Sequence, residues 1–206
     1  MIVKLLHHTP LEVADIAICK CYGNEPHSDS EKVKARINRV ANVSKHASTI
    51  EHLTYSFDID GISRACLQEV VRHRVSSYTV KSSRYTLQEL KDEASLWFDF
   101  PKDCPWDIGY KYLVKVDDII DSHNIKQLGF IQTALNRGAP NDKAKYLLPE
   151  AYKTSLVMTI NARSLQNFLE LRSSKHALWE IQLLAKAMYE AIPDEHKFLY
   201  DNIVQS

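Results

Sequence analysis

The sequence predicts an α+β fold in a single domain that covers residues 1–206. Three segments have the residue pattern of strands, and most of the others have the apolar periodicity of helices. A length of 206 residues, of which 45% are hydrophobic and 25% charged, is typical of one soluble globular domain. We therefore expect a twisted, mostly antiparallel sheet flanked by helices, with a long amphipathic helix near the C-terminus.

The first part of the chain predicts one strand and two helices. The stretch IVKLL at residues 2–6 has the composition of a short strand. Apolar residues then recur at helical spacing, which predicts a helix begun by Thr9 and Pro10. A second helix, capped by Ser30, follows the polar loop at 23–30. Its buried side should consist of Val33, Ile37, Val40 and Ala41.

The best-defined strand lies at residues 52–60, with the sequence HLTYSFDID. Apolar and polar side chains alternate there, which is the period of a half-buried strand. Gly61 should end this strand, and a helix should follow over residues 62–74. The apolar stripe of that helix would contain Ile62, Ala65, Cys66, Leu67, Val70 and Val71.

The second half of the chain predicts helices around one further strand. Residues 86–125 should form helical pieces and loops, and a helix over 125–136 should be stopped by GAPND. The stretch KTSLVMTIN at 153–161 is rich in Thr, Val and Ile, which favours a strand. A helix capped by Ser164 follows, and the long amphipathic helix covers residues 176–192.

Positive charge is concentrated in one patch, RHRVSSYTVKSSRY at residues 72–85. The whole chain is neutral, with 26 Lys and Arg against 26 Asp and Glu, yet this patch contains no acidic residue. The helix macrodipole accounts for Arg72, His73 and Arg74 as a C-terminal cluster, but not for the rest of the patch. Fixed cations interleaved with hydroxyl groups suit a phosphate or another oxygen-rich anion.

Arg172 is a second unusual cation. Helical spacing places it on the same face as Leu165, Phe168 and Leu169. An arginine that continues an apolar stripe needs an anionic partner, because an unpaired buried guanidinium is costly. The alternative, which the spacing supports equally well, is that the Arg172 side chain reaches past the end of the helix to water.

Several kinds of site are disfavoured. The four cysteines lack paired CxxC spacings, and we expect no metal site. Cys66 lies among apolar residues and should be a small core residue, not a nucleophile. Neither the basic patch nor the segment at 161–172 contains the carboxylate pair of glycosidases and two-metal hydrolases, and the sequence lacks the Gly-rich phosphate loops.

Two other functions compete for the same residues. A module that binds RNA or a nucleotide could use the basic patch and its tyrosines, although a neutral chain argues against RNA. A hydrolase that uses Cys66 or His73 is the other alternative. The sequence contains neither a run of about 18 apolar residues nor a secretory signal, so we expect a cytoplasmic protein without a membrane partner.

Four motifs resemble those of the flavin-dependent thymidylate synthases. Arg72-His73-Arg74, seven residues and Ser82 match the RHR(x)7S signature of that family, and the match continues through Ser83-Arg84-Tyr85. The blocks EHLT at 51–54 and LLPEAYKT at 147–154 are also similar to the family in order and spacing. So is the block at 161–172, NARSLQNFLELR.

The resemblance implies that the chain methylates C5 of the uracil of dUMP to give dTMP. Methylenetetrahydrofolate would supply the carbon, and FAD, reduced by NADPH, would supply the hydride, without a cysteine nucleophile. It also implies a homotetramer with active sites at subunit interfaces, and no nucleic-acid partner.

The resemblance also implies roles for individual residues. Arg172 would polarise the uracil as the catalytic residue. The substrate would be bound by Glu69, Arg72, Ser82, Ser83, Arg84, Lys145 and Arg172. The FAD-binding residues would be His52, Thr54, Arg72, His73, Arg74, Asn161, Arg163 and Asn167.

The chain departs from the family pattern at three places. Thr79 and Val80 stand where many members have an acid or amide, and Glu69 follows Gln68 where Arg-Gln is usual. Lys145 replaces an arginine, which keeps the charge and loses the bidentate geometry. These changes concern how the substrate is bound, not the class of reaction.

Overall fold

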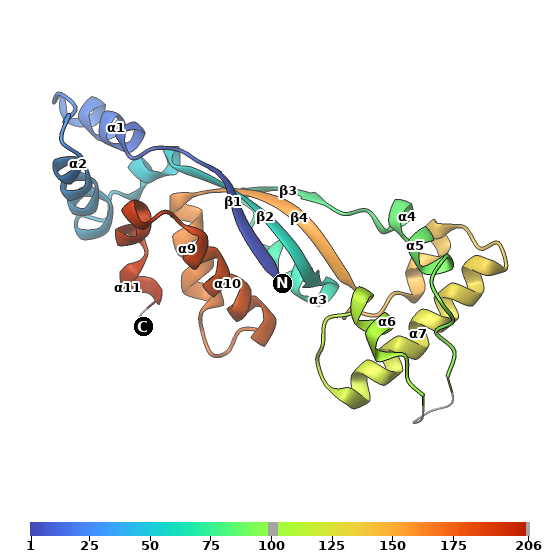
Figure 1. Ribbon diagram of the computed structural model, residues 1–206. Coiled ribbons are helices and arrows are strands. Elements are labelled where there is room, and N and C mark those ends of the chain that lie inside the picture. The colour runs from blue at the N-terminus through green and yellow to red at the C-terminus, as the bar shows by residue number, and fades with distance from the viewer. Residues whose placement is uncertain (99–102, 205–206) are drawn as a thin grey trace. The chain divides into compact units, whose positions relative to one another are not determined.

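The computed structural model describes residues 1–98 and 103–204, which form one four-stranded antiparallel sheet and a set of helices (Figure 1). The strands are β1 (Ile2–His8), β2 (Thr54–Ser63), β3 (Ser76–Val80) and β4 (Lys153–Asn161). The longer helices are α1 (Glu12–Tyr22), α2 (Ser30–Ile37), α3 (Arg64–Val70), α6 (Trp106–Tyr112), α7 (Asp118–Asn136), α9 (Ala162–Arg172) and α10 (Trp179–Ala191). The short helices are α4 (Ser83–Thr86), α5 (Gln88–Lys91), α8 (Asn141–Ala144) and α11 (Asp201–Val204), with a π-helix η1 (Asn38–Val43) and 3₁₀ helices η2 (Ala47–His52), η3 (Lys145–Leu147) and η4 (Asp194–Leu199).

The chain divides into two compact units. Unit 1 consists of Met1–Asp60, Glu69–Thr79 and Leu156–Ser206, and unit 2 consists of Gly61–Gln68 and Val80–Ser155. The chain therefore enters and leaves unit 2 twice, so the units do not follow one another along the sequence. The assignment of residues 1–206 to one domain stays a prediction.

The sheet has the order β1-β2-β4-β3, so β2 and β4 are its central strands. The alternation predicted in β2 is confirmed, because Tyr55, Phe57 and Ile59 are fully buried. β4 has the predicted bounds. Gly61 does not end β2, which continues to Ser63. A positive φ of 76° at Gly61, which glycine adopts without a steric penalty, lets the strand pass this point.

The basic patch begins after a helix and continues as a strand, which the sequence did not predict. α3 ends at Val70, so Arg72, His73 and Arg74 lie beyond it, and Val71 is exposed. The Tyr78 hydroxyl donates to the carbonyl oxygens of Val70 (3.0 Å) and His73 (2.6 Å), which ties the turn to the following strand. β3 is an edge strand that pairs with β4. It has no alternating apolar pattern of its own that would have predicted it from the sequence.

Three predicted helix starts were wrong, and at two of them a neighbouring side chain makes the capping bond. Asp29, not Ser30, accepts from the Glu31 N–H, and the predicted buried side of α2 and η1 is confirmed. Asn161, not Ser164, caps α9 by accepting from the Ser164 N–H at 2.8 Å. α1 starts at Glu12, and the Thr9 hydroxyl hydrogen-bonds that of Thr54 instead.

The core of unit 1 lies between its helices and its strands. α10 packs on β1 and α9, as the red and orange helices beside the sheet in Figure 1 show. α10 buries Ile181, Leu184, Ala185 and Met188, while α9 buries the predicted Leu165, Phe168 and Leu169. α10 covers 179–191, slightly less than the predicted range.

The core of unit 2 is organised by α7. This helix begins at Asp118, earlier than predicted, and α5, α6 and α8 pack on it. Gly129 of α7 lies close to the backbone of Leu96, where a Cβ atom would be 3.1 Å from the Leu96 carbonyl oxygen. The buried apolar side chains of α7 are Ile125, Leu128, Ile131 and Leu135.

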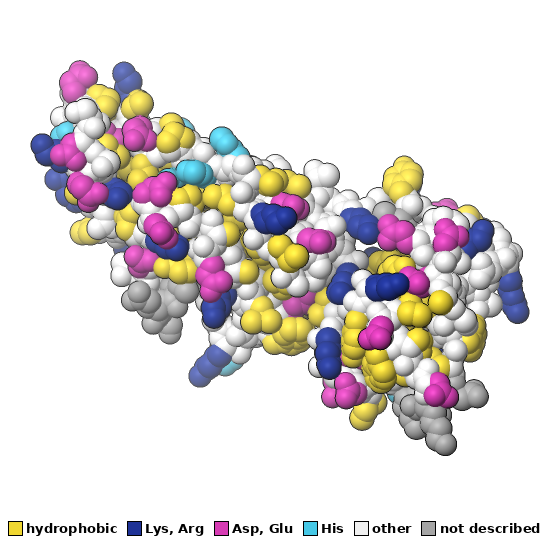
Figure 2. Space-filling view, viewed as in Figure 1, with side chains coloured by type: hydrophobic (Ala, Val, Ile, Leu, Met, Phe, Trp, Pro, Cys, Tyr) yellow, Lys and Arg dark blue, Asp and Glu magenta, His cyan; other side chains and the backbone are white. Residues whose placement is uncertain are grey.

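The surface carries both signs of charge. On the face shown in Figure 2, Lys and Arg side chains are interspersed with Asp and Glu over both units. This face lacks the extended basic surface that an RNA-binding module requires. Among residues 1–98 and 103–204, no helix combines the length and the apolar character needed to cross a membrane.

The N-terminal cap of α7 predicts a measurable loss of stability. Asp117 accepts from the N–H groups of Ile119 (2.9 Å) and Ile120 (3.4 Å). Asp117→Ala should lower the free energy of unfolding by about 1 kcal/mol, because those donors lose their acceptor. Urea unfolding monitored by circular dichroism measures the change. Asp117→Ser keeps an acceptor and should cost much less, so equal losses in the two variants would contradict the cap.

Candidate functional site

A cavity in unit 1 brings together residues from three distant parts of the chain. Its volume is about 690 Å³. Most of the side chains that the sequence predicted for FAD line it. The lining residues are Glu51, Arg72, His73, Arg74, Val75, Asn161, Arg163, Ser164, Asn167, Leu171 and Arg172.

The end of β4 determines how α9 contributes to this cavity. The Ala162 N–H donates to the Leu53 carbonyl oxygen at 2.7 Å, which joins the start of α9 to the segment before β2. From there Arg163 and Asn167, four residues apart, lie on the same side of α9. Arg163 Nη1 donates to the Glu51 carboxylate at 2.6 Å, so this cation is already paired.

Arg172 makes three hydrogen bonds within unit 1. Its Nη1 donates to the Glu69 carboxylate at 2.8 Å, and its Nη2 donates to the Glu69 carbonyl oxygen at 3.0 Å. Its Nε donates to His73 Nε2 at 2.9 Å. The sequence left two alternatives for this side chain, and the structure has the paired one. The resemblance had suggested the substrate as the anionic partner of Arg172, whereas in this structure that partner is Glu69.

His73 is held as a neutral imidazole. Burial, together with the positive charge of Arg172, lowers the pKa of His73 to about 4, although Glu69 acts in the opposite direction. The ring also packs on Phe168, with the two centroids 4.7 Å apart. A neutral ring can accept the Arg172 hydrogen bond through Nε2, which a protonated ring cannot do.

A second cavity, of about 300 Å³, lies in unit 2 and contains the remaining predicted anion-binding residues. Ser82, Ser83, Arg84 and Lys145 line it, and so does Val80. Its lining also has Arg64, Lys81 and Lys153, together with Leu67, Tyr152 and Thr154, and no carboxylate among the described residues. Neither Arg64 nor Lys153 was predicted from the sequence to belong to a site.

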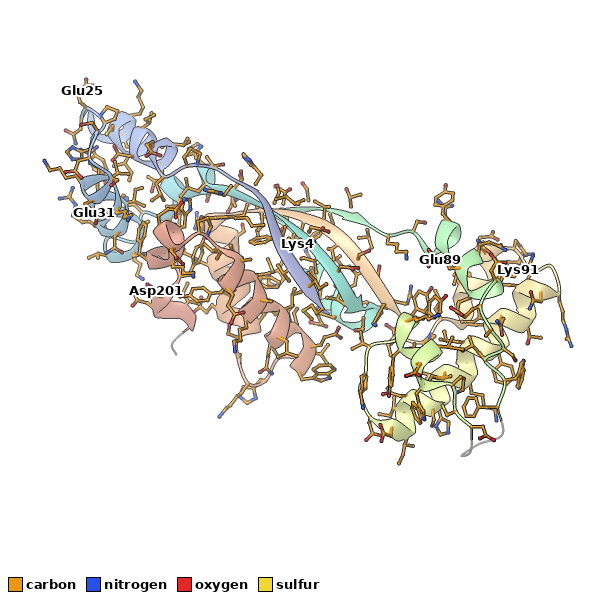
Figure 3. The ribbon with its side chains drawn as sticks, viewed as in Figure 1. Lys4, Glu25, Glu31, Glu89, Lys91 and Asp201 are labelled. Atoms are coloured by element: carbon orange, nitrogen blue, oxygen red, sulfur yellow. The ribbon has the colours of Figure 1, made fainter. Side chains whose placement is uncertain are left out.

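Several bonds hold the loop of the unit 2 cavity in place. The Lys81 N–H donates to the Ser155 carbonyl oxygen at 2.8 Å, and Asn141 Nδ2 donates to the Arg84 carbonyl oxygen at 2.8 Å. Lys81 Nζ lies 3.6 Å from the carboxylate of Glu89, which Figure 3 labels on α5. Lys153 Nζ donates to the Tyr110 carbonyl oxygen at 2.6 Å.

Some sequence-predicted residues are not brought into these two cavities. Among the described residues, the linings include neither His52 nor Thr54, and the Thr54 hydroxyl bonds Thr9. Glu69, predicted to bind the substrate, is also absent from both linings and instead accepts two hydrogen bonds from Arg172. Cys66 is fully buried, which fits the predicted core role and leaves the hydrolase alternative without an accessible thiol.

A cluster that the sequence did not indicate lies elsewhere in unit 1. Ligand atoms of His8, Glu195 and His196 lie within 4.8 Å of one another, and two imidazoles with one carboxylate are a donor set for divalent transition metals. His196 Nδ1 is hydrogen-bonded to the Tyr55 hydroxyl at 2.8 Å. β1 and η4 supply these residues from opposite ends of the chain, so no local spacing marks them.

The chain is similar to known proteins over nearly its whole length. The family model described as thymidylate synthase complementing protein matches residues 4–196. Proteins named flavin-dependent thymidylate synthase from Wolinella succinogenes and Campylobacter jejuni are each 51% identical, over 97% and 98% of this chain respectively and 97% of each relative. A crystal structure of ThyX from Helicobacter pylori with FAD and dUMP has a TM-score of 0.93 and 44% identity, and covers 100% of both chains.

The Arg172 contact predicts how His73 titrates. In the intact protein His73 should titrate with a pKa of about 4, and Arg172→Ala should raise this pKa, because a neighbouring positive charge is removed. NMR titration of the imidazole Cε1–H signal measures both values. Arg163→Ala removes a cation from the same cavity without touching this contact, and should leave the titration unchanged. A wild-type pKa near 6.5 would contradict the assignment.

The same shift predicts that acid destabilises unit 1. The unfolded chain binds a proton at His73 near pH 6.5, whereas the folded chain binds it only near pH 4. Stability contributed by neutral His73 is therefore present above pH 6.5 and is lost as the pH falls toward 4. Urea midpoints measured between pH 7 and 4 should fall more steeply in the wild type than in His73→Gln.

Proposed function

Because the chain belongs to the family of flavin-dependent thymidylate synthases, we propose that it converts dUMP to dTMP with FAD as its bound cofactor. The family match over residues 4–196 and the 51% identity to two named members support this activity. We further propose methylenetetrahydrofolate as the carbon donor and NADPH as the reductant. When bound, FAD supplies the hydride that completes the methyl group.

The observation that carries the proposal is the donor set of the unit 1 cavity. Arg72, Arg74 and Arg163 offer guanidinium groups, and Asn161 and Asn167 offer amides. The one carboxylate in the lining, Glu51, is already paired with Arg163. A surplus of cations and amides fits a dinucleotide, whose diphosphate is anionic and whose rings present oxygen and nitrogen acceptors. Arg72, Arg74, Asn161, Arg163 and Asn167 would hold it.

The unit 2 cavity would hold the phosphate of the nucleotide substrate. Ser82 and Ser83 offer hydroxyl groups, while Arg84 and Lys145 offer positive charge beside them. This combination recognises a phosphate monoester without a Gly-rich loop. Val80 lines the cavity and has no polar side-chain atom, so any contact from this position to the nucleotide comes from the backbone.

Arg172 is the residue to which we assign the chemistry. A guanidinium beside the uracil stabilises the negative charge that develops on the ring as hydride reaches it. Glu69 and His73 orient this guanidinium through its three hydrogen bonds. The neutral state of His73 matters, because a second positive charge there would repel Arg172.

We also propose a homotetramer with active sites at subunit interfaces. Trp179 and Leu183 of α10 are 45% and 53% exposed, which supports an interface on this helix. Sedimentation velocity tests the assembly. A monomer at micromolar concentration would contradict it.

An absorbance experiment tests the cofactor and the function together. The purified protein should show a flavin spectrum, which NADPH bleaches in the absence of oxygen. Addition of dUMP and methylenetetrahydrofolate should then yield dTMP. A protein that takes up no FAD and oxidises no NADPH would instead favour the nucleotide-binding module.

Arg172→Ala separates catalysis from cofactor binding. Turnover should fall about 100-fold, because a preorganised donor to the developing charge is lost. The flavin spectrum should remain, because the other cavity residues are intact. Steady-state kinetics and absorbance measure the two effects. Arg172→Lys keeps the charge and should retain more activity. Loss of flavin, or unchanged turnover, would argue against this role.

A further inference from the structure

Arg64 is a cation of the unit 2 cavity for which no role has been assigned. It is the first residue of α3, and its backbone N–H donates to the Tyr152 carbonyl oxygen at 3.0 Å. Its Nε atom is buried and has no hydrogen-bond partner among the residues that the structure describes. A buried guanidinium nitrogen without an acceptor is costly, and such a group in a native protein points to a missing partner.

Three of the other four cations of this cavity have partners within unit 2. Lys153 donates to the Tyr110 carbonyl oxygen, and Lys81 lies 3.6 Å from Glu89. The Arg84 guanidinium lies over the Tyr85 ring, 5.7 Å from its centroid. No carboxylate of the described part of the chain forms an ion pair with Arg64. The acceptor for its Nε must therefore come from outside the described residues.

The chemistry of the lining identifies that acceptor. Arg64, Lys81, Arg84, Lys145 and Lys153 share a cavity of about 300 Å³, and hydroxyl groups of Ser82, Ser83 and Thr154 lie among them. So many cations in a small space repel one another unless a multiply charged anion is bound. A phosphate monoester carries nearly two negative charges and three acceptor oxygens. The uracil and deoxyribose of a nucleotide are neutral and would leave this charge unbalanced.

We propose that Arg64 binds the 5′-phosphate of dUMP. This inference rests on the proposed function and adds a residue to its substrate site. Lys145 presents a point charge, whereas the planar guanidinium of Arg64 can direct Nε–H and Nη–H to two oxygens of one phosphate. Arg64 thus supplies the bidentate contact that a lysine at position 145 cannot make.

Calorimetric binding of dUMP and of deoxyuridine, which lacks the phosphate, tests the role of Arg64 directly. Arg64→Ala should weaken dUMP binding about 10- to 100-fold, as expected for the loss of a charge-assisted contact. Binding of deoxyuridine and of FAD should be unchanged. In steady-state kinetics KM for dUMP should rise by a similar factor while kcat changes little, because the phosphate is remote from the reacting carbon.

Matched variants distinguish binding from a structural role. Arg137→Ala removes an exposed cation from unit 2 outside this cavity, and should leave dUMP binding unchanged. Arg64→Lys keeps the positive charge but loses the two-pronged geometry of the guanidinium group. Its affinity for dUMP should therefore lie between those of the wild type and of Arg64→Ala. If Arg64→Ala is unstable, the ratio of dUMP to deoxyuridine affinity in Arg64→Lys provides the same test.

Three results would overturn the inference. They are unchanged dUMP affinity in Arg64→Ala, equal weakening of dUMP and deoxyuridine, and a rise in KM confined to NADPH, whose 2′-phosphate is also a monoester. Failure of the proposed function is a separate observation. If the wild type binds dUMP through Arg64 but forms no dTMP, the phosphate contact stands and the proposed activity does not.

Discussion

The pairing of β2 with β4 at the centre of the sheet is the contact on which the unit 1 cavity depends. Tyr55, Phe57 and Ile59 on β2, and Met158 on β4, are fully buried. Because their alternation determines which face of each strand is buried, a slip of one residue would expose them all. The register therefore fixes where β4 ends and α9 begins. The bond from the Ala162 N–H to the Leu53 carbonyl oxygen then brings Arg163 to Glu51.

The two cavities differ in how the charges of their cations are balanced. Arg163 and Arg172 have carboxylate partners in unit 1, and these ion pairs orient the side chains that line its cavity. In unit 2, the cavity has a lining of cations and hydroxyl groups, and Arg64 has a buried donor that no described residue accepts. Arg163 and Arg172 are therefore oriented before a ligand binds, whereas the cations of the unit 2 cavity need an anion to balance their charge. The neutral imidazole of His73 also orients Arg172, because it accepts a hydrogen bond from that side chain without adding a charge.

Two of the corrected helix starts, those of α2 and α9, share one cause. Ser30 and Ser164 have good capping side chains, but Asp29 and Asn161 lie one position and three positions earlier and make the bonds. Several residues near a helix start compete for the same N–H groups, and the path of the preceding chain decides among them. β3 was missed for a related reason, because an edge strand of Ser, Tyr and Thr has little apolar alternation and is formed by its neighbour in the sheet.

The sequence by itself determined the α+β class, the bounds of β4, the buried face of β2 and the family, because these depend on local periodicity and on motifs that are contiguous in the chain. It also indicated the anion-binding character of residues 72–85. Only the tertiary structure decided that this patch divides between two cavities, with Arg72, His73 and Arg74 in one and Ser82, Ser83 and Arg84 in the other. The pairing of Arg172 with Glu69 and the unpartnered Nε of Arg64 were likewise decided there. Each depends on burial and on contacts between residues far apart in the sequence, and a spacing pattern along one helix or strand carries no information about either.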